Sequence, residues 1–167
     1  MRIISGFLKG KSLAFIKNLN TRPLKDVVKE NIFNILEHSN LMNVNLKESN
    51  VLDLYSGIGS FGLESISRGA KKVTFIEKDE NAVEILNKNI KKLSIVNKSK
   101  IFNDEIEKVL LNDLDEKFNI FFFDPPFNED SYIKNLEIIK KQKLFRASHV
   151  VIVHRERKTK EILDDYI

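Results

Sequence analysis

VLDLYSGIGSFG, residues 51–62, is the part of the chain with the clearest local pattern. An apolar run ends in the acid Asp53, and Gly57, Gly59 and Gly62 follow before a segment with helical spacing. Glycines let the chain reverse tightly and let its backbone approach a ligand. The pattern predicts a strand, a glycine turn and the start of a helix, whose N–H groups suit an anion. Taken alone it is also typical of a dinucleotide site, so its context must decide.

Strands and helices alternate along the rest of the chain. Predicted strands cover residues 73–77, 100–103, 120–123 and 149–154; predicted helices cover residues 60–68, 132–141 and 157–166 and the segments Ala82–Leu93 and Ile106–Leu110. Gly69 suits the end of the first of these helices, and Asp79 can cap the next. The alternation predicts a doubly wound, mostly parallel α/β sheet with its ligand at the carboxyl ends of the strands.

The first forty residues are predicted to form a β-hairpin and a helix. Two short strands, residues 2–5 and 12–15, flank a glycine-containing loop, and a helix opens at Thr21-Arg22-Pro23, where proline is tolerated. Its apolar stripe comprises Leu24, Val27, Val28, Ile32, Ile35 and Leu36. We expect Arg22, Lys25 and Lys29 to lie off this stripe, free to meet a partner.

Basic side chains are concentrated in the same segment. Residues 1–30 hold seven Lys and Arg against two acids, whereas the whole chain carries a net charge of only +4. A basic arm on a near-neutral body favours a polyanion partner, and an ordinary solvated surface is the alternative. We therefore expect residues 1–40 to form a nucleic-acid-binding extension of a main domain at residues 41–167. The candidate contacts are Arg2, Lys9, Lys11 and Arg22.

Composition limits the class of protein. A chain of 167 residues with 42% hydrophobic and 31% charged residues is typical of one soluble globular domain with an appendage. No apolar run approaches the roughly 20 residues of a membrane span, and the start of the chain does not resemble a secretory signal. There is no cysteine, and the three histidines lack metal-ligand spacing. We expect a cytoplasmic monomer with no membrane contact and no metal.

A second motif distinguishes among the ligands that a glycine turn can hold. FFFDPPF ends an apolar strand in Asp124, and a dehydrogenase has no use for this acid or for Asp53. S-adenosylmethionine suits both, since its carboxylate fits a helix amino terminus and its sulfonium is favoured near carboxylates. Glu77 follows Gly57 by 20 residues, the spacing of an acid that binds ribose hydroxyls. We expect ribose and adenine to lie toward Glu77 and Asp104.

The residues from Asp124 to Phe127 have the chemistry to activate an exocyclic amino group. Such a nitrogen is a poor nucleophile because its lone pair is delocalised into the ring. If the Asp124 carboxylate and the Pro125 carbonyl each accept one N–H, the lone pair is directed at a methyl carbon and no strong base is needed. Pro125 and Pro126 remove two backbone donors. Phe127 offers a face for an unstacked base.

Each assignment has a structural alternative. Asp and Pro both favour turns, so the motif could simply end a strand. Glu77 and Asp104 could be surface acids at strand ends. Tyr55 and Phe61 are more typical of packing residues than of ligand contacts, although Tyr55 is included among the cofactor candidates.

The chain resembles a known family, the bacterial small-subunit (16S) ribosomal RNA guanine-N2 methyltransferases, which are class I enzymes with a Rossmann-like sheet. The similarity covers nearly the whole chain, as RIISGFLKGKSL, TRPLKDVVKENIFNIL, VLDLYSGIGSFGLESISRGA, VTFIEKD and FFFDPPF in the family's order. It implies methylation of a guanine amino group in ribosomal RNA, free or in an assembling small-subunit particle. The cofactor positions that it implies are Asp53, Gly57, Gly59, Glu77 and Asp104, and the catalytic loop is Asp124, Pro125, Pro126 and Phe127.

The chain also departs from this family. Ile58 replaces a small hydroxyl residue, and Leu24, Val27 and Lys29 stand where the family has Thr, Arg and Arg. The family's fold ends in a further strand pair, yet no strand is evident after Arg155, so we expect a shortened chain or an incomplete last sheet edge. Two other functions stay open: an adenine-N6 methyltransferase acting on DNA or RNA, and a non-catalytic nucleic-acid-binding scaffold.

Overall fold

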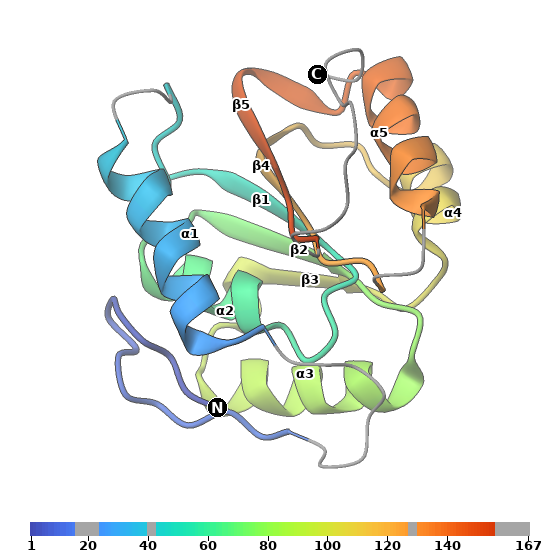
Figure 1. Cartoon of the computed structure of the whole chain (residues 1–167). Coiled ribbons are helices and arrows are strands. Elements are labelled where there is room, and N and C mark those ends of the chain that lie inside the picture. Colours follow the sequence, from blue (N-terminus) through green and yellow to red (C-terminus); the bar gives the residue numbers. More distant parts are fainter. Residues whose placement is uncertain (16–23, 40–42, 127–129, 156–167) are drawn as a thin grey trace.

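A five-stranded parallel sheet forms the centre of the molecule in the computed structural model, which describes residues 1–15, 24–39, 43–126 and 130–155 (Figure 1). Its strands are β1 (Asn50–Leu54), β2 (Lys72–Ile76), β3 (Ser99–Phe102), β4 (Phe118–Phe123) and β5 (Phe145–Val153). Their order is β3-β2-β1-β4-β5, and every neighbouring pair is parallel. This confirms the doubly wound sheet. The order reverses between β1 and β4, and α/β folds bind ligands outside the carboxyl ends of such strands.

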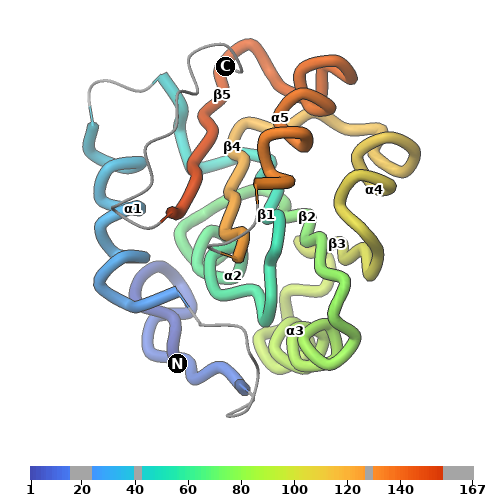
Figure 2. Tube along the Cα trace, turned by 45° about the vertical axis from the view of Figure 1, so that its right-hand side comes forward, coloured from blue at the N-terminus to red at the C-terminus, as the bar shows by residue number. Residues whose placement is uncertain are grey.

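Helices cover both faces of the sheet. They are α1 (Asp26–His38), α2 (Ser60–Ser67), α3 (Glu80–Lys92), α4 (Ile106–Asn112) and α5 (Ser131–Gln142), with a 3-10 turn η1 (Val96–Lys98) before β3. Figures 1 and 2 show α1, α2 and α3 on one side of the sheet and α4 and α5 on the other. The Asp79 carboxylate accepts the Ala82 amide at 2.9 Å, which confirms the predicted cap of α3.

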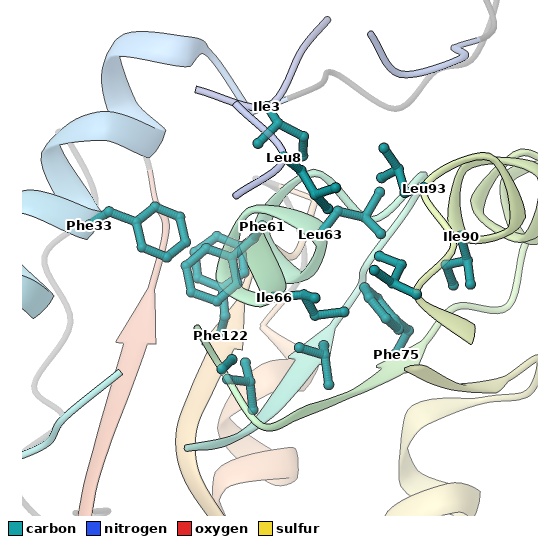
Figure 3. Close-up of a cluster of buried hydrophobic side chains, with 14 of the residues drawn as sticks. Ile3, Leu8, Phe33, Phe61, Leu63, Ile66, Phe75, Ile90, Leu93 and Phe122 are labelled. Atoms are coloured by element: carbon teal, nitrogen blue, oxygen red, sulfur yellow. The ribbon is translucent and has the colours of Figure 1, made fainter. Parts of the chain in front are cut away.

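Two hydrophobic cores follow from strand geometry, because successive side chains of a strand point to opposite faces. Phe75 and Phe122 pack with α1, α2 and α3 in one core, shown in Figure 3. Phe121 and Phe123 pack with α4 and α5 in the other. The predicted burial of β4 on both faces is therefore confirmed, since Ile120 and the three phenylalanines after it are all buried.

The apolar stripe predicted for the first helix is partly wrong. Val27 and Ile35 are 69% and 52% exposed, whereas Lys29 and Phe33 are fully buried. The reason is aromatic packing: the rings of Phe33 and Phe61 stack with centroids 5.0 Å apart, and Phe61 stacks on Phe122 at 3.9 Å (Figure 3). This stack turns a different face of α1 toward the sheet. The predicted opening at Thr21-Arg22-Pro23 lies outside the described residues.

The amino-terminal segments run antiparallel as predicted, but their pairing is reduced to one bridge, between Arg2 and Ser12. The pairing stops after Ile3 because the next two amides bond to α2 instead. Ile4 and Ser5 donate their N–H groups to the two carboxylate oxygens of Glu64, at 2.8 and 2.9 Å. On the second segment, the side-chain amide of Asn89 bonds both the N–H and the carbonyl of Ala14. Helix side chains thus replace the strand ladder.

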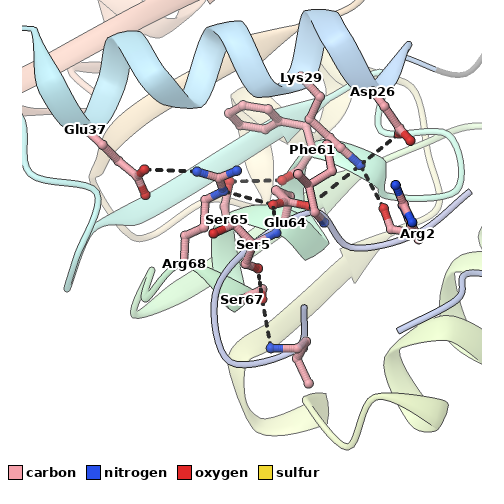
Figure 4. Close-up of polar contacts among 12 residues, drawn as sticks. Arg2, Ser5, Asp26, Lys29, Glu37, Phe61, Glu64, Ser65, Ser67 and Arg68 are labelled. Carbon is pink, nitrogen blue, oxygen red and sulfur yellow. Dashed lines mark hydrogen bonds and ion pairs between the residues drawn. The ribbon is translucent and has the colours of Figure 1, made fainter. Parts of the chain in front are cut away.

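Lys29 does not lie free for a partner, which corrects the sequence-based expectation. Its Nζ lies 3.2 Å from the Arg2 carbonyl oxygen, 3.3 Å from Ser60 Oγ and 3.7 Å from the Glu64 carboxylate (Figure 4). Burial lowers the pKa of the Lys29 amine, and the negative charges of Glu64 and Asp26 act in the opposite direction. The lysine therefore joins the amino-terminal segment and α1 to the first turn of α2.

The carboxyl-terminal part of the described chain ends with β5, parallel to β4. Residues 156–167, which include the helix predicted at residues 157–166, lie outside the described residues. Within the described ranges, no helix is both long and apolar enough to cross a membrane.

Candidate active site

The glycine turn connects β1 to α2 at the carboxyl edge of the sheet. Gly57 and Gly59 have φ values of +53° and +85°, a left-handed backbone that side chains rarely adopt. A Cβ on Gly59 would come within 2.4 Å of Leu86, but a Cβ on Gly57 would meet nothing within 4 Å. Gly59 is thus needed for packing, and Gly57 borders open space in which a ligand can approach the backbone.

Asp53 lies near the carboxyl end of β1, just before this turn. It is 1% exposed, and its Oδ2 accepts the amide of Gly62 in the first turn of α2 at 2.9 Å. Burial raises the pKa of the Asp53 carboxyl well above its usual range, and the charges of Asp124 and Glu77 raise it further. The ends of β1, β2 and β4 therefore form a concentrated acidic site, where a positively charged ligand is favoured.

We expect Asp53→Asn to stabilise the fold by about 1–3 kcal/mol at alkaline pH, the scale of relieving a poorly solvated buried group. With its pKa raised in the folded state, Asp53 contributes most to stability when protonated, and this contribution is lost as pH rises through the folded pKa. The neutral Asn keeps an acceptor for Gly62. Urea unfolding at several pH values between roughly 5 and 9 measures the gap, which should widen with pH. The exposed Asp113→Asn is the control, and an equal gap at every pH would contradict the prediction.

Glu77 follows β2 and binds the glycine turn directly. One carboxylate oxygen accepts the Gly57 amide at 2.7 Å, and the other accepts the Asp79 amide at 2.9 Å. The side-chain amide of Asn103 donates to the Glu77 carbonyl at 3.0 Å, a contact that sequence reasoning missed. Asn103 is the last residue of the predicted strand 100–103, and a polar residue at a strand's carboxyl end was the available signal. These bonds fix the loops that border the open side of Gly57.

Tyr55 and Asp104 are less tightly associated with this cluster. The Tyr55 hydroxyl contacts Ser131 Oγ at 3.2 Å and accepts the side-chain amide of Asn135 at 3.0 Å, so it faces α5. Asp104 follows the edge strand β3, and its carboxylate pairs with Lys108. The hydrogen bond from Lys108 lowers the pKa of Asp104, and the Glu105 amide adds to this effect. Neither position is tested by these contacts, and both stay predictions.

Asp124 follows β4, the neighbour of β1, and its side chain is 23% exposed. Its Oδ1 lies 2.7 Å from Nδ1 of His154, the first residue after β5. Arg155 Nη1 donates to the Pro126 carbonyl at 3.1 Å. Sequence reasoning missed both contacts, although the predicted strand 149–154 ended in this histidine. Phe127 lies outside the described residues.

A family model described as "Conserved hypothetical protein 95" matches residues 1–166. The chain belongs to this family. It is 30% identical to the Ribosomal RNA small subunit methyltransferase D of Haemophilus influenzae, over 94% of this chain and 79% of that protein. It is also 30% identical to the protein of the same name from Buchnera aphidicola (strain APS), over 93% of this chain and 78% of that one. The family resemblance read from the sequence is confirmed.

Solved structures agree with this family membership. The structure of yhhF from Escherichia coli has a TM-score of 0.78 and 26% identity, and the match covers 92% of this chain and 78% of that one. The structure of HI0767 from Haemophilus influenzae has a TM-score of 0.73 and 28% identity, over 96% and 84% of the two chains. The sheet is that of a class I methyltransferase, as predicted.

In this methyltransferase fold the amino-terminal segment runs alongside α2. The Arg2 carbonyl lies near Ser60 at the start of α2, and the loop with Lys9 is bonded near the end of α2 through the Ser67 carbonyl. The side chains of Arg2, Lys9 and Lys11 are exposed, and Arg22 lies outside the described residues. Arg2 pairs with Ser12, the residue after Lys11, so Arg2 and Lys11 lie on neighbouring segments, and their contact with RNA stays a prediction. Among the described residues, no group of acids and histidines is arranged to hold a metal ion.

Proposed function

We propose that this protein transfers a methyl group from S-adenosylmethionine to the N2 amino group of a guanine in small-subunit ribosomal RNA. The observation that carries the proposal is the position of Asp124, partly exposed at the switch point beside the glycine turn and bonded to His154, the residue after the neighbouring strand β5. The names of the relatives support ribosomal RNA as the substrate. The choice of guanine N2 rests on the family resemblance of the sequence.

The residues around the glycine turn fit the cofactor. The open side of Gly57 admits a ligand against the backbone, and the acids Asp53, Glu77 and Asp124 lie at this edge of the sheet, where a bound cation would favour their ionised forms. Glu77 and Asp104 would hold the nucleoside, and α2 would face the carboxylate with its amino terminus. When bound, S-adenosylmethionine supplies a methyl carbon activated by a positively charged sulfur. Acids near the sulfur attract that charge without bonding to the methyl group.

Asp124 and Pro125 would orient the amino group of the base. Each accepts one N–H, which directs the nitrogen lone pair at the methyl carbon, and the extra proton passes to solvent after transfer. Positioning is therefore the main contribution of the loop. Phe127 would stack on the guanine after it leaves its neighbours. The exposed Arg2, Lys9 and Lys11 would bind phosphates along the side of α2.

The test is nucleoside analysis of RNA after incubation with the protein and methyl-labelled S-adenosylmethionine. Unmodified small-subunit ribosomal RNA is supplied both free and in reconstituted particles, so the preferred form is measured in the same experiment. We expect label in N2-methylguanosine. Label in N6-methyladenosine alone would overturn the choice of guanine and support the adenine alternative. Cofactor binding in calorimetry with no labelled nucleoside in either RNA would support the non-catalytic scaffold.

A further inference from the structure

β5 ends directly beside the proposed catalytic loop. Val153 pairs with Phe123, and the His154 amide then donates to the Phe123 carbonyl at 2.8 Å. This bond continues the parallel pairing by one residue beyond the end of β5 and brings His154 alongside Asp124. Their ring nitrogen and carboxylate oxygen lie 2.7 Å apart, within the range of a strong charge-assisted bond.

The chemistry of the pair sets the direction of this bond. An ionised carboxylate has only acceptors, so His154 Nδ1 must carry the hydrogen. The bond occupies Oδ1 of Asp124, and within the described part of the chain no hydrogen bond reaches Oδ2. The side chains of Asp124 and His154 are 23% and 27% exposed, so the pair is accessible to solvent. Oδ2 is therefore the oxygen that can accept an N–H from a substrate.

The next residue holds the other end of the same loop. Arg155 donates to the Pro126 carbonyl and, at 3.3 Å, to the Asp130 carboxylate, and its guanidinium lies 5.0 Å from the centre of the Tyr132 ring. Its side chain is 9% exposed. Two consecutive residues at the end of β5 thus hold the loop at its first and third residues. Such an anchorage limits rotation of the Asp124 carboxylate.

We propose that His154 is a positioning residue for methyl transfer. Its Nδ1–H holds Oδ1 of Asp124 so that Oδ2 faces the amino group of the target base. The inference rests on the proposed function, since it assigns Asp124 the role of an acceptor for that amino group. His154 acts through Asp124 and makes no contact with the methyl group.

Three substitutions of His154 separate this role from general packing. His154→Ala removes the donor. His154→Asn places a side-chain N–H the same number of bonds from the backbone as Nδ1, and His154→Gln places it one bond farther away. We expect His154→Ala and His154→Gln to lower kcat about ten- to a hundredfold with little change in KM for RNA or cofactor, because misplaced groups act mainly on the chemical step. His154→Asn should keep most of the wild-type rate.

The matched control is His149→Asn. His149 lies on the same strand, and its Nδ1 contacts the Arg146 carbonyl oxygen, remote from the loop. It should keep the wild-type kcat. Cofactor affinity by calorimetry and the unfolding midpoint are measured for every variant, and the three His154 variants should match in both.

Each possible outcome either supports or overturns the positioning role of His154. Wild-type kcat in His154→Ala would overturn the positioning role, and so would a rate in His154→Asn as low as that in His154→Ala. A loss shared by all three variants together with a lowered unfolding midpoint would assign His154 to stability instead and also overturn it. If the wild-type protein itself places no label in guanine, the proposed function fails, and this result is separate because it needs no variant.

Discussion

Asp124→Ala is expected to lower the kcat of methyl transfer roughly a hundredfold or more while leaving cofactor affinity nearly unchanged. The carboxylate lies at the carboxyl end of β4 and has one oxygen bonded to His154. Its proposed hydrogen bond to the amino group strengthens as positive charge develops on the nitrogen during methyl transfer, so its loss acts mainly on the transition state. Single-turnover methylation with saturating RNA and cofactor measures this step without product release.

Asp124→Asn tests whether the role of Asp124 depends on its negative charge. It keeps an acceptor oxygen but loses the charge, so its rate should fall between those of the wild type and the Ala variant. The exposed Asp113→Ala is the control and should not change the rate. Because Asp124 raises the pKa of Asp53, its removal relieves repulsion in the folded state, which offsets part of the lost hydrogen bond to His154. Wild-type turnover in Asp124→Ala would mean that the loop works by another mechanism.

Glu64→Ala is expected to destabilise the protein by about 3–5 kcal/mol, the scale of breaking a buried ion pair. Glu64 is fully buried and accepts the amides of Ile4 and Ser5 and the Nε–H of Arg68 (Figure 4). Its removal leaves two backbone donors unpaired and takes a carboxylate from beside the buried Lys29 amine. Urea unfolding followed by circular dichroism measures the loss.

Two further variants test this prediction, one as an intermediate case and one as a surface control. Glu64→Gln keeps one acceptor oxygen and should lose less stability than Glu64→Ala. Glu84→Ala removes a glutamate from an exposed pair with Lys88 on α3 and should leave unfolding unchanged, because such surface pairs contribute little. If Glu64→Ala unfolds at the same urea concentration as the wild type, the amino-terminal segment is not held by this carboxylate.

Most of the fold could be predicted from local sequence. The glycine turn after β1, the cap of α3 at Asp79 and the buried β4 all depend on residues within a few positions of one another. Alternation of strands and helices was sufficient for the class of sheet, because parallel strands need crossover helices. The acids at the ends of the strands could also be predicted from local sequence. Asp53, Glu77 and Asp124 each directly follow apolar residues in the sequence.

Contacts between distant segments were not predictable in this way. Helical spacing alone put Val27 and Ile35 on the packed face of α1, but stacking of Phe33 on Phe61 decided the orientation and buried Lys29 instead. In isolation, a lysine such as Lys29 or a glutamate such as Glu64 is predicted to lie at the surface. Only their meeting in space, with the Ile4 and Ser5 amides also nearby, makes burial of both favourable.

The sequence by itself determined the order of the elements, the glycine turn, and the acids that end the strands, because each depends on backbone preferences and apolar spacing along a short segment. Tertiary structure alone decided that His154 faces Asp124 and that Arg155 holds Pro126. The physical reason is strand pairing. The register of β5 on β4 is set by the whole packed sheet, and it brings together side chains thirty positions apart that no local pattern relates.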